Sequence, residues 1–141
     1  MFEDRVLNVL PFAGSHVGDG WSSYFLGVNH SKRGLALDLK GAEGADVLRR
    51  LLRNADVFLE NFRPGSLDKL GFGVEDTRRL NPRLVHCSIS GYGKNGPKRH
   101  LPGYDPVAQA ESGFMDITGP ADGPPMRTGI AMTDYLAGLY A

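Results

Sequence analysis

The sequence has little of what several protein classes require. A single cysteine among 141 residues leaves no internal disulfide framework, and four histidines, at positions 16, 30, 86 and 100, lack metal-ligand spacing. No segment approaches the ~18 consecutive apolar residues of a membrane span. Acidic and basic residues balance at sixteen each, which argues against nucleic-acid binding by bulk charge. These absences predict a soluble cytoplasmic protein, mitochondrial if the source is eukaryotic, with no metal, membrane or nucleic-acid partner.

Glycine and proline, by contrast, are abundant, with nineteen and nine residues. Periodic segments lie between them, so the composition indicates many turns and functional loops rather than disorder. A chain of this length allows one domain with a core. The last residues, 136–141, are apolar and lack a helix-ending glycine or basic residue. This ending predicts a fragment of a longer protein.

The apolar residues recur with two different periods along the chain. Alternation or short apolar runs predict strands at 35–39, 56–60 and 84–90, and helical spacing predicts helices at 41–55, 66–70, 74–80 and 107–114. Residues 21–28 fit either a short helix or a strand. Strand, helix and strand within ~30 residues form a βαβ unit. The expected fold is therefore α/β, with a mainly parallel sheet and flanking helices.

Polar residues follow each expected strand. In parallel sheets, ligands bind beyond the carboxyl ends of the strands, so the loops after Leu39, Glu60 and Ser90 are expected to lie close together. These loops form a glycine-rich, partly basic rim that suits a phosphorylated ligand. The basic run at 98–100 fits a phosphate contact and a solvated loop equally well.

Two further motifs fail on their context. Gly91, Gly93 and Gly96 have the spacing of a dinucleotide fingerprint, but Pro97 follows where a helix must begin. A nicotinamide or flavin module is therefore disfavoured. Cys87 lies in the middle of an apolar strand, where cysteine is usually a small buried hydrophobe, so we assign it a structural role.

One carboxylate stands out near the end of the chain. Thr133 is a candidate N-cap, which places Asp134 in a first helical turn, where the helix dipole favours the ionised form. Ala137, Gly138 and Ala141 share its helical face and leave room for close approach. Asp134 is thus either an accessible nucleophile or an ordinary first-turn acid, and local spacing leaves both readings open.

Eight spaced motifs carry a resemblance. They are Asn-His-Ser-Lys-Arg at 29–33, Leu-Ala-Leu-Asp-Leu-Lys at 35–40, Glu-Asn-Phe-Arg-Pro-Gly at 60–65, Leu-Gly-Phe at 70–72, Ser-Ile-Ser-Gly-Tyr-Gly at 88–93, Gly-Pro at 96–97, Pro-Gly-Tyr-Asp at 102–105 and Thr-Asp at 133–134. In this order they resemble the family III CoA-transferases, the CaiB/BaiF family. The resemblance implies a Rossmann-like partial domain over 22–141, truncated at both ends, and leaves 1–21 unassigned.

The resemblance also implies a chemistry. Members of the family move coenzyme A from an acyl-CoA to a carboxylic acid, through an aspartyl anhydride and an aspartyl-CoA thioester, and Asp134 matches the nucleophile. Coenzyme A contacts are implied at Leu37, Asp38, Leu39, Lys40, Asn61, Phe62, Arg63, Lys69, Pro102, Gly103, Tyr104 and Asp105. Coenzyme A is a substrate here, and no permanently bound cofactor is implied. Family members form interlinked homodimers, which the full-length protein is expected to share.

Two alternatives remain beside the transferase. A racemase branch of the family uses a histidine where this chain has Tyr104, and a phenol is a poor base near neutral pH, which disfavours proton abstraction. The second alternative is a catalytically inactive fragment that binds coenzyme A. Within the transferases, residues 112–119 and 129–134 look most like enzymes that use succinyl-CoA and small dicarboxylic acids such as glutarate.

Overall fold

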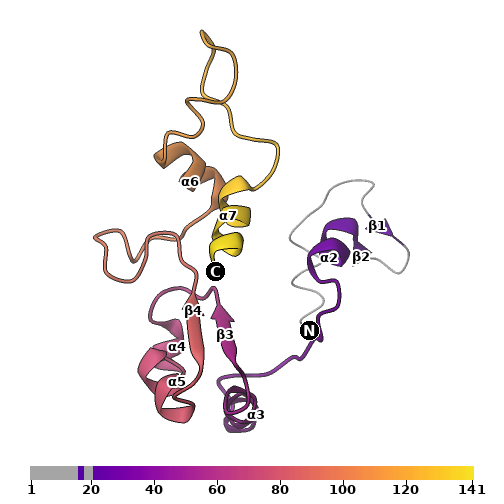
Figure 1. Ribbon diagram of the computed structural model, residues 1–141, viewed down its shortest axis with the longest axis vertical. Helices are drawn as coiled ribbons and strands as arrows, with labels where there is room; N and C mark the ends of the chain where they lie inside the picture. Colours follow the sequence, from indigo (N-terminus) through magenta and orange to yellow (C-terminus); the bar gives the residue numbers. More distant parts are fainter. Residues whose placement is uncertain (1–15, 18–20) are drawn as a thin grey trace. The chain divides into compact units, whose positions relative to one another are not determined.

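The computed structural model describes residues 16–17 and 21–141 and divides the chain into two compact units, Met1–Ala45 and Asp46–Ala141. In the first unit, β1 (His16–Val17) pairs antiparallel with β2 (Trp21–Ser22), and α2 (Ser23–Val28) follows directly (Figure 1). The segment expected to be either helix or strand therefore contains both. The other residues of the unassigned N-terminal segment, 1–15 and 18–20, lie outside the described residues.

The strand expected at 35–39 is absent, and this prediction was wrong. The chain is irregular there, and Leu35 is exposed. No described residue supplies a neighbouring strand, and alternation alone cannot pair backbone N–H and C=O groups. Asp38 instead forms a turn: its Oδ1 accepts the Lys40 N–H at 3.0 Å, and its carbonyl accepts the Gly41 N–H at 3.2 Å. This turn leads into α3 (Ala42–Leu52), which confirms the expected amphipathic helix.

The second unit contains a parallel βαβ arrangement. Strand β3 (Val57–Glu60) is followed by α4 (Ser66–Lys69), α5 (Val74–Leu80) and β4 (Val85–Ser88), and the two strands pair in parallel. Figure 1 shows α4 and α5 beside this strand pair. The α/β class is confirmed, but the crossover helices are those between β3 and β4 rather than α3.

Period-two alternation gives the strand pair two different faces. Val57 and Val85 are exposed on one face, whereas Glu60 is buried on the other. The register places Phe58 opposite His86 and Glu60 opposite Ser88. Polar side chains therefore line the covered face at the end of β3.

The core beside the strands is small. Its largest buried side chain is Phe72, 1% exposed, and the Arg49 guanidinium lies 5.4 Å from the centre of its ring. Asn81 joins α5 to the end of α3: its Nδ2 donates to the carbonyl oxygens of Leu52 and Ala55, each at 3.0 Å. The Leu52 carbonyl otherwise receives only the long Ala55 N–H bond, at 3.4 Å, so Asn81 caps the end of α3 from nearly thirty residues away.

Two helices complete the unit. Helix α6 (Asp105–Glu111) has Asp105 in its first turn, as its sequence predicts, and ends before the expected 114; α7 (Met132–Tyr140) begins just before Asp134. They pack together, as Figure 1 shows. Within the described part of the chain, no helix is long and apolar enough to cross a bilayer.

We expect Asn81→Ala to lower the free energy of unfolding by about 1–3 kcal/mol, because two helix-end carbonyls lose their donor. Asn54→Ala is the matched control, since the exposed Asn54 Nδ2 reaches only the carbonyl of Arg50, at 3.1 Å, and we expect a change within about 0.5 kcal/mol. Urea denaturation measures both. Equal losses in the two variants would contradict the capping role of Asn81.

Candidate active site

A buried carboxylate fixes the start of α7. Asp105, 8% exposed, lies in the first turn of α6, and its Oδ1 accepts the Thr133 backbone N–H at 2.9 Å and the Thr133 hydroxyl at 2.6 Å. Thr133 was expected to be the N-cap, and that prediction was wrong. Ala131 occupies the cap position without a side-chain hydrogen bond, and Asp105 supplies the missing acceptor from 28 residues away.

Gln109 holds Asp105 in place. It lies one helical turn further along α6, is fully buried, and donates from Nε2 to the second Asp105 oxygen at 2.7 Å. Its Nε2 also lies 3.3 Å from the Ile130 carbonyl, and its Oε1 accepts the Thr128 N–H at 2.9 Å. The Gln109 amide therefore holds both the Asp105 carboxylate and the segment just before α7, at Thr128 and Ile130.

Asp105 and Asp134 have opposite pKa shifts. Burial alone would raise the pKa of Asp105, but hydrogen bonds from Thr133, Gln109 and the Asp134 backbone outweigh it and lower the pKa below its ordinary value. Partial burial raises the pKa of Asp134, and the negative charge of Asp105 raises it further. The expectation that the helix start favours ionised Asp134 is therefore wrong in direction.

The N–H groups at the start of α7 already have acceptors. The Met132 N–H donates to Ile130 at 2.9 Å, the Thr133 N–H to Asp105, and the Tyr135 N–H to Ala131 at 3.0 Å. The Asp134 N–H also hydrogen-bonds to Asp105, which lowers the pKa of Asp105 further. These groups are therefore not available to stabilise an oxyanion beside Asp134.

Asp134 opens into a cleft of about 570 Å³. Its side chain is exposed, and Ala137 and Gly138 line the cleft on the same helical face, as their spacing predicts. The remaining lining comes from the loops after β3 and β4, from α6 and from Thr133 of α7: Asn61, Ile89, Ser90, Gly91, Tyr92, Gly103, Tyr104, Asp105, Ala108 and Thr133. The volume is in the range of small-molecule sites. We call it the Asp134 cleft.

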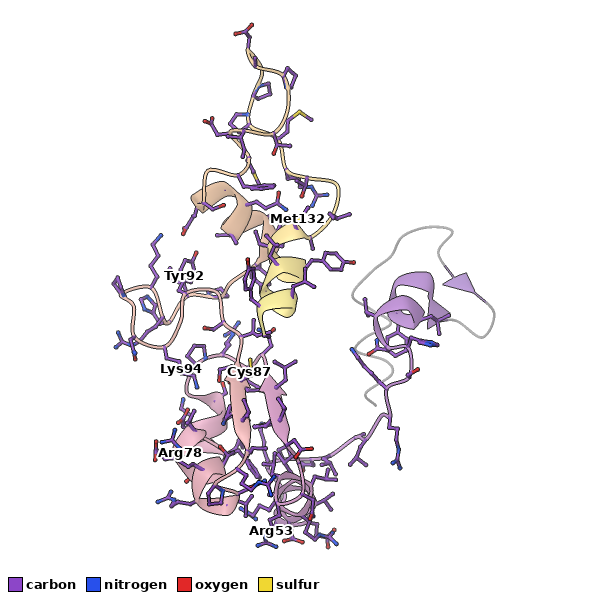
Figure 2. The ribbon with its side chains drawn as sticks, viewed as in Figure 1. Arg53, Arg78, Cys87, Tyr92, Lys94 and Met132 are labelled. Atoms are coloured by element: carbon purple, nitrogen blue, oxygen red, sulfur yellow. The ribbon has the colours of Figure 1, made fainter. Side chains whose placement is uncertain are left out.

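The two strand-end loops meet as expected. The Asn61 side chain donates to the Ile89 carbonyl at 2.8 Å, which ties the loop after β3 to the loop after β4. Gly91 and Gly103 close the base of the second loop, where a Cβ on Gly91 would lie 2.3 Å from the Gly103 Cα. Only glycine permits that approach. Figure 2 shows Tyr92 and Lys94 on this loop.

The structure gathers part of the expected coenzyme A set. Asn61, Gly103, Tyr104 and Asp105 line the Asp134 cleft together with Asp134. The remaining members of the second unit lie outside the cleft lining: Phe62, Arg63, Lys69 and Pro102. Residues 37–40 belong to the first unit. All of these contacts stay predictions.

Several residues of the site escaped sequence reasoning. Gln109 had a usable signal, because it lies four residues after Asp105 on one helical face. Tyr92 lies in the loop after Ser90, which was expected at the site, whereas Ala108 had no signal, since its helix meets Asp134 only in the folded chain. Cys87, given a structural role, is half-buried on β4 (Figure 2). Among the described residues, no group of three or more His, Cys, Asp or Glu side chains could hold a metal ion.

The sequence pattern of CoA-transferase family III matches residues 3–141, and the chain belongs to that family. Over 120 residues the chain is 48% identical to a succinyl-CoA:glutarate CoA-transferase of Mus musculus, covering 85% of this chain and 28% of the relative. A succinate–glutarate CoA-transferase of Agrobacterium fabrum is 46% identical, covering 93% and 33%. A formyl-CoA:oxalate CoA-transferase of Streptomyces avermitilis is 42% identical, covering 85% and 29%. The chain thus spans about a third or less of the length of these relatives.

Solved structures agree with this assignment. A CaiB/BaiF family protein from Brucella suis superposes with a TM-score of 0.75 at 43% identity, covering 77% of this chain and 29% of that one. Rv3272 from Mycobacterium tuberculosis superposes with a TM-score of 0.72 at 31% identity, covering 86% and 36%. The α/β fold described above is therefore the fold of part of a CaiB/BaiF protein.

The Asp105 network predicts a specific pH dependence. Because the folded pKa of Asp105 lies below its ordinary value of 3.8, its stabilisation is complete above pH 3.8 and is lost as the pH falls through the folded pKa. We expect Asp105→Asn to lower the free energy of unfolding by about 1–3 kcal/mol at pH 7. Below pH 3.8, we expect this gap in the free energy of unfolding between wild type and variant to narrow.

Urea denaturation between pH 2.5 and 7 measures this gap. Asp122→Asn is the control, because Asp122 is exposed on a loop, and we expect it to follow wild type. A gap that stays constant across the whole pH range would contradict the role given to the Asp105 carboxylate.

Proposed function

We propose that the protein transfers coenzyme A from an acyl-CoA to a carboxylic acid, with Asp134 as the nucleophile. The observation that carries the proposal is the exposed Asp134 carboxylate in a cleft formed by the loops after β3 and β4. Membership of CoA-transferase family III supports the class of reaction. The acyl-CoA is a substrate, and no resident cofactor is invoked.

The exchange needs four acyl transfers at Asp134. A carboxylate oxygen of Asp134 attacks the thioester carbon, the C–S bond breaks, and coenzyme A leaves as the thiolate, which gives a mixed anhydride. The thiolate attacks the aspartyl carbonyl, and the donor acid leaves as a carboxylate. The acceptor carboxylate attacks the aspartyl-CoA thioester, and the released thiolate attacks the acceptor carbonyl of the new anhydride. Asp134 is thereby regenerated, and a difficult exchange is divided into easier steps.

The surroundings of Asp134 suit this role. A carboxylate with a raised pKa is a stronger nucleophile once it is ionised, and burial together with the charge of Asp105 raises the pKa of Asp134. Ala137 and Gly138 leave the carboxylate open on one side. Because the N–H groups of the first turn of α7 are occupied, stabilisation of the developing oxyanion is assigned to groups outside this turn.

The substrates we propose are succinyl-CoA and a small dicarboxylic acid such as glutarate. Two relatives named for succinate and glutarate are 46% and 48% identical to this chain, against 42% for the formyl-CoA:oxalate enzyme. A cytoplasmic or mitochondrial homodimer is proposed on the resemblance alone. Size-exclusion chromatography with light scattering of the natural polypeptide that contains residues 1–141 tests the dimer.

Asp134→Asn tests the nucleophile. In the natural polypeptide that contains residues 1–141, we expect the turnover of succinyl-CoA with glutarate to fall on the order of 10⁴-fold, because an amide cannot form the anhydride. Asp122→Asn, on an exposed loop, should retain wild-type turnover. Mass spectrometry of the acid-quenched wild type should locate coenzyme A on the peptide that carries Asp134. Near-normal turnover of Asp134→Asn would refute the assignment.

The racemase alternative makes a different prediction. Tyr104, which stands where the racemase branch has a histidine, and Asp134 line the same cleft. Exchange of the α-proton of a 2-methylacyl-CoA for deuterium in D₂O, without transfer to glutarate, would favour the racemase. We expect transfer without that exchange.

The inactive-fragment alternative follows from the share of its relatives that the chain spans. Calorimetric titration of the 141-residue chain with coenzyme A, together with a turnover assay on the same chain, distinguishes an active transferase from an inactive fragment that binds coenzyme A. Binding without turnover in this chain, alongside turnover in the natural polypeptide, would identify it as a coenzyme A-binding part. Turnover by the 141-residue chain itself would exclude the inactive reading.

A further inference from the structure

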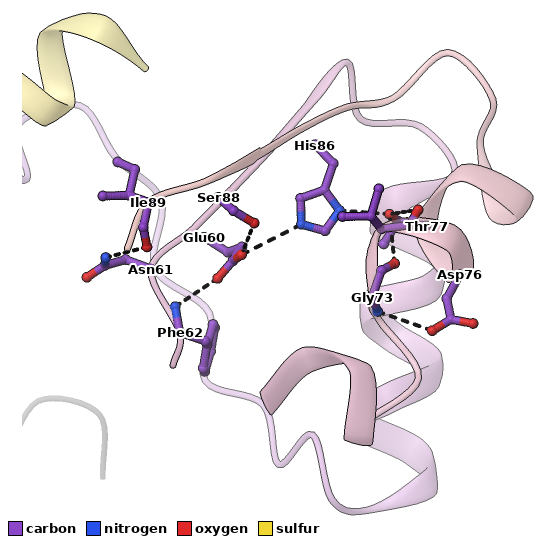
Figure 3. Close-up of polar contacts among 10 residues, drawn as sticks. Glu60, Asn61, Phe62, Gly73, Asp76, Thr77, His86, Ser88 and Ile89 are labelled. Carbon is purple, nitrogen blue, oxygen red and sulfur yellow. Dashed lines mark hydrogen bonds and ion pairs between the residues drawn. The ribbon is translucent and has the colours of Figure 1, made fainter. Parts of the chain in front are cut away.

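A second polar cluster lies behind the Asn61–Arg63 loop, and the proposed reaction does not use it. Glu60, the last residue of β3, is 8% exposed, and its Oε2 accepts the backbone N–H of Phe62 at 2.8 Å. Its Oε1 accepts the hydroxyl of Ser88 on the neighbouring strand. Figure 3 shows the carboxylate between Phe62 and Ser88. One side chain therefore ties the first turn of the loop to the sheet.

His86 stands behind this carboxylate. Its Nε2 lies 3.9 Å from the Glu60 Oε1, and its Nδ1 lies 2.8 Å from the Thr77 hydroxyl (Figure 3). The Gly73 carbonyl, a second acceptor near that hydroxyl, already receives the Thr77 backbone N–H at 2.9 Å. The hydroxyl also lies 3.0 Å from the Val74 carbonyl, so Thr77 ties the His86 ring to α5.

The electrostatics agree with a neutral ring. Burial lowers the pKa of His86, and the charge of Lys94 lowers it further, which together outweigh the opposing effect of Glu60. A neutral imidazole presents a dipole, rather than a net charge, to Glu60. The Glu60 oxygens thus keep their capacity to accept hydrogen bonds from Phe62 and Ser88.

Stability alone does not account for this carboxylate. A buried acid is costly unless it is paired, and well-packed apolar side chains often replace buried charged groups without loss of stability. What an apolar side chain at position 60 cannot do is accept the Phe62 N–H. That N–H belongs to the loop for which coenzyme A contacts are predicted at Asn61, Phe62 and Arg63.

The loop is held at its backbone and left open at its side chains. Glu60 fixes the Phe62 N–H, and the Asn61 side chain is fixed on the Ile89 carbonyl at 2.8 Å. The Phe62 ring is 48% exposed and the Arg63 side chain is also exposed. The backbone of such a loop is already ordered before the ligand binds, so the loss of backbone entropy on binding is smaller. The Phe62 ring and the Arg63 guanidinium are then presented from a fixed backbone.

We propose that Glu60 is a positioning residue, which sets the backbone of the Asn61–Arg63 loop so that its side chains bind coenzyme A. The inference rests on the proposed function for the identity of the ligand. Glu60 acts through the Phe62 N–H and takes no part in the acyl transfers at Asp134. The Ser88 hydroxyl holds the Glu60 carboxylate in the orientation that this requires.

Three variants of the natural polypeptide that contains residues 1–141 test the proposal. We expect Glu60→Ala to raise the KM for succinyl-CoA and the Kd for free coenzyme A on the order of 10-fold or more, because the Phe62 N–H loses a charged acceptor. The kcat and the KM for glutarate should stay within about 3-fold of wild type. Glu60→Gln retains one acceptor oxygen for Phe62, and we expect it to restore both constants to within about 3-fold. Ser88→Ala should raise them by less than Glu60→Ala does.

Asn81→Ala is the structural control, since it is expected to destabilise the same unit without touching the loop. It should leave the KM for succinyl-CoA unchanged. A Glu60→Ala variant that lowers only the thermal midpoint, or a Glu60→Gln variant that binds coenzyme A as weakly as Glu60→Ala, overturns the proposal. Where Glu60→Ala does not fold, Ser88→Ala decides the matter, and an unchanged Kd for coenzyme A in Ser88→Ala overturns the proposal.

Failure of the proposed function gives a different pattern. If wild type binds coenzyme A but transfers none of it, the function is refuted, and the ratio of Kd values between Glu60→Ala and wild type still decides the role of Glu60. If turnover occurs and that ratio is near one, the positioning role alone is refuted.

Discussion

The buried Asp105 carboxylate is the constraint on which the candidate site depends. Its hydrogen bonds to Thr133 join the first turn of α6 to the first turn of α7, although the two residues are 28 apart in the chain. The neighbouring residue, Asp134, is thereby fixed in the cleft, and the same negative charge raises its pKa. Asp105 therefore fixes where the proposed nucleophile lies and, after burial, is the second cause of its raised pKa. A carboxylate with fewer donors would leave α7 less firmly placed and Asp134 closer to its ordinary acidity.

The strand pair makes a second, separate contribution. Alternation in β3 and β4 leaves valines on the open face and directs Glu60, His86 and Ser88 to the covered face. Those polar residues lie just before the loops that follow each strand. The chemistry proposed at Asp134 and the support inferred for the Asn61–Arg63 loop thus arise from different elements. They meet only at the strand ends, where parallel sheets commonly bind ligands.

The sequence predicted much of this arrangement where the signal was local. The periodicity of the apolar residues predicted the ranges of α3, β3, α5 and β4 to within a few residues. Helical spacing predicted that Ala137 and Gly138 lie on the same face as Asp134. The errors share one cause, which is that the deciding partner is remote. The alternation at 35–39 finds no neighbouring strand among the described residues, and Thr133 receives its cap from Asp105 rather than supplying one. The role of Asp134 and the coenzyme A contacts came from the resemblance, because no local pattern distinguishes a nucleophile from a structural acid.

The contact between Gly91 and Gly103 has a consequence for how this fold can change. Two backbones touch at the base of the loop, so residues between them leave and return at one fixed point. Closure entropy grows only slowly with the length of such a loop. The excursion can therefore gain or lose residues, or change its charge, while the strand end and the start of α6 stay where they are. Tyr92 lies on this excursion and lines the Asp134 cleft, so a change in the excursion alters one wall of the cleft without displacing the helix that carries Asp134.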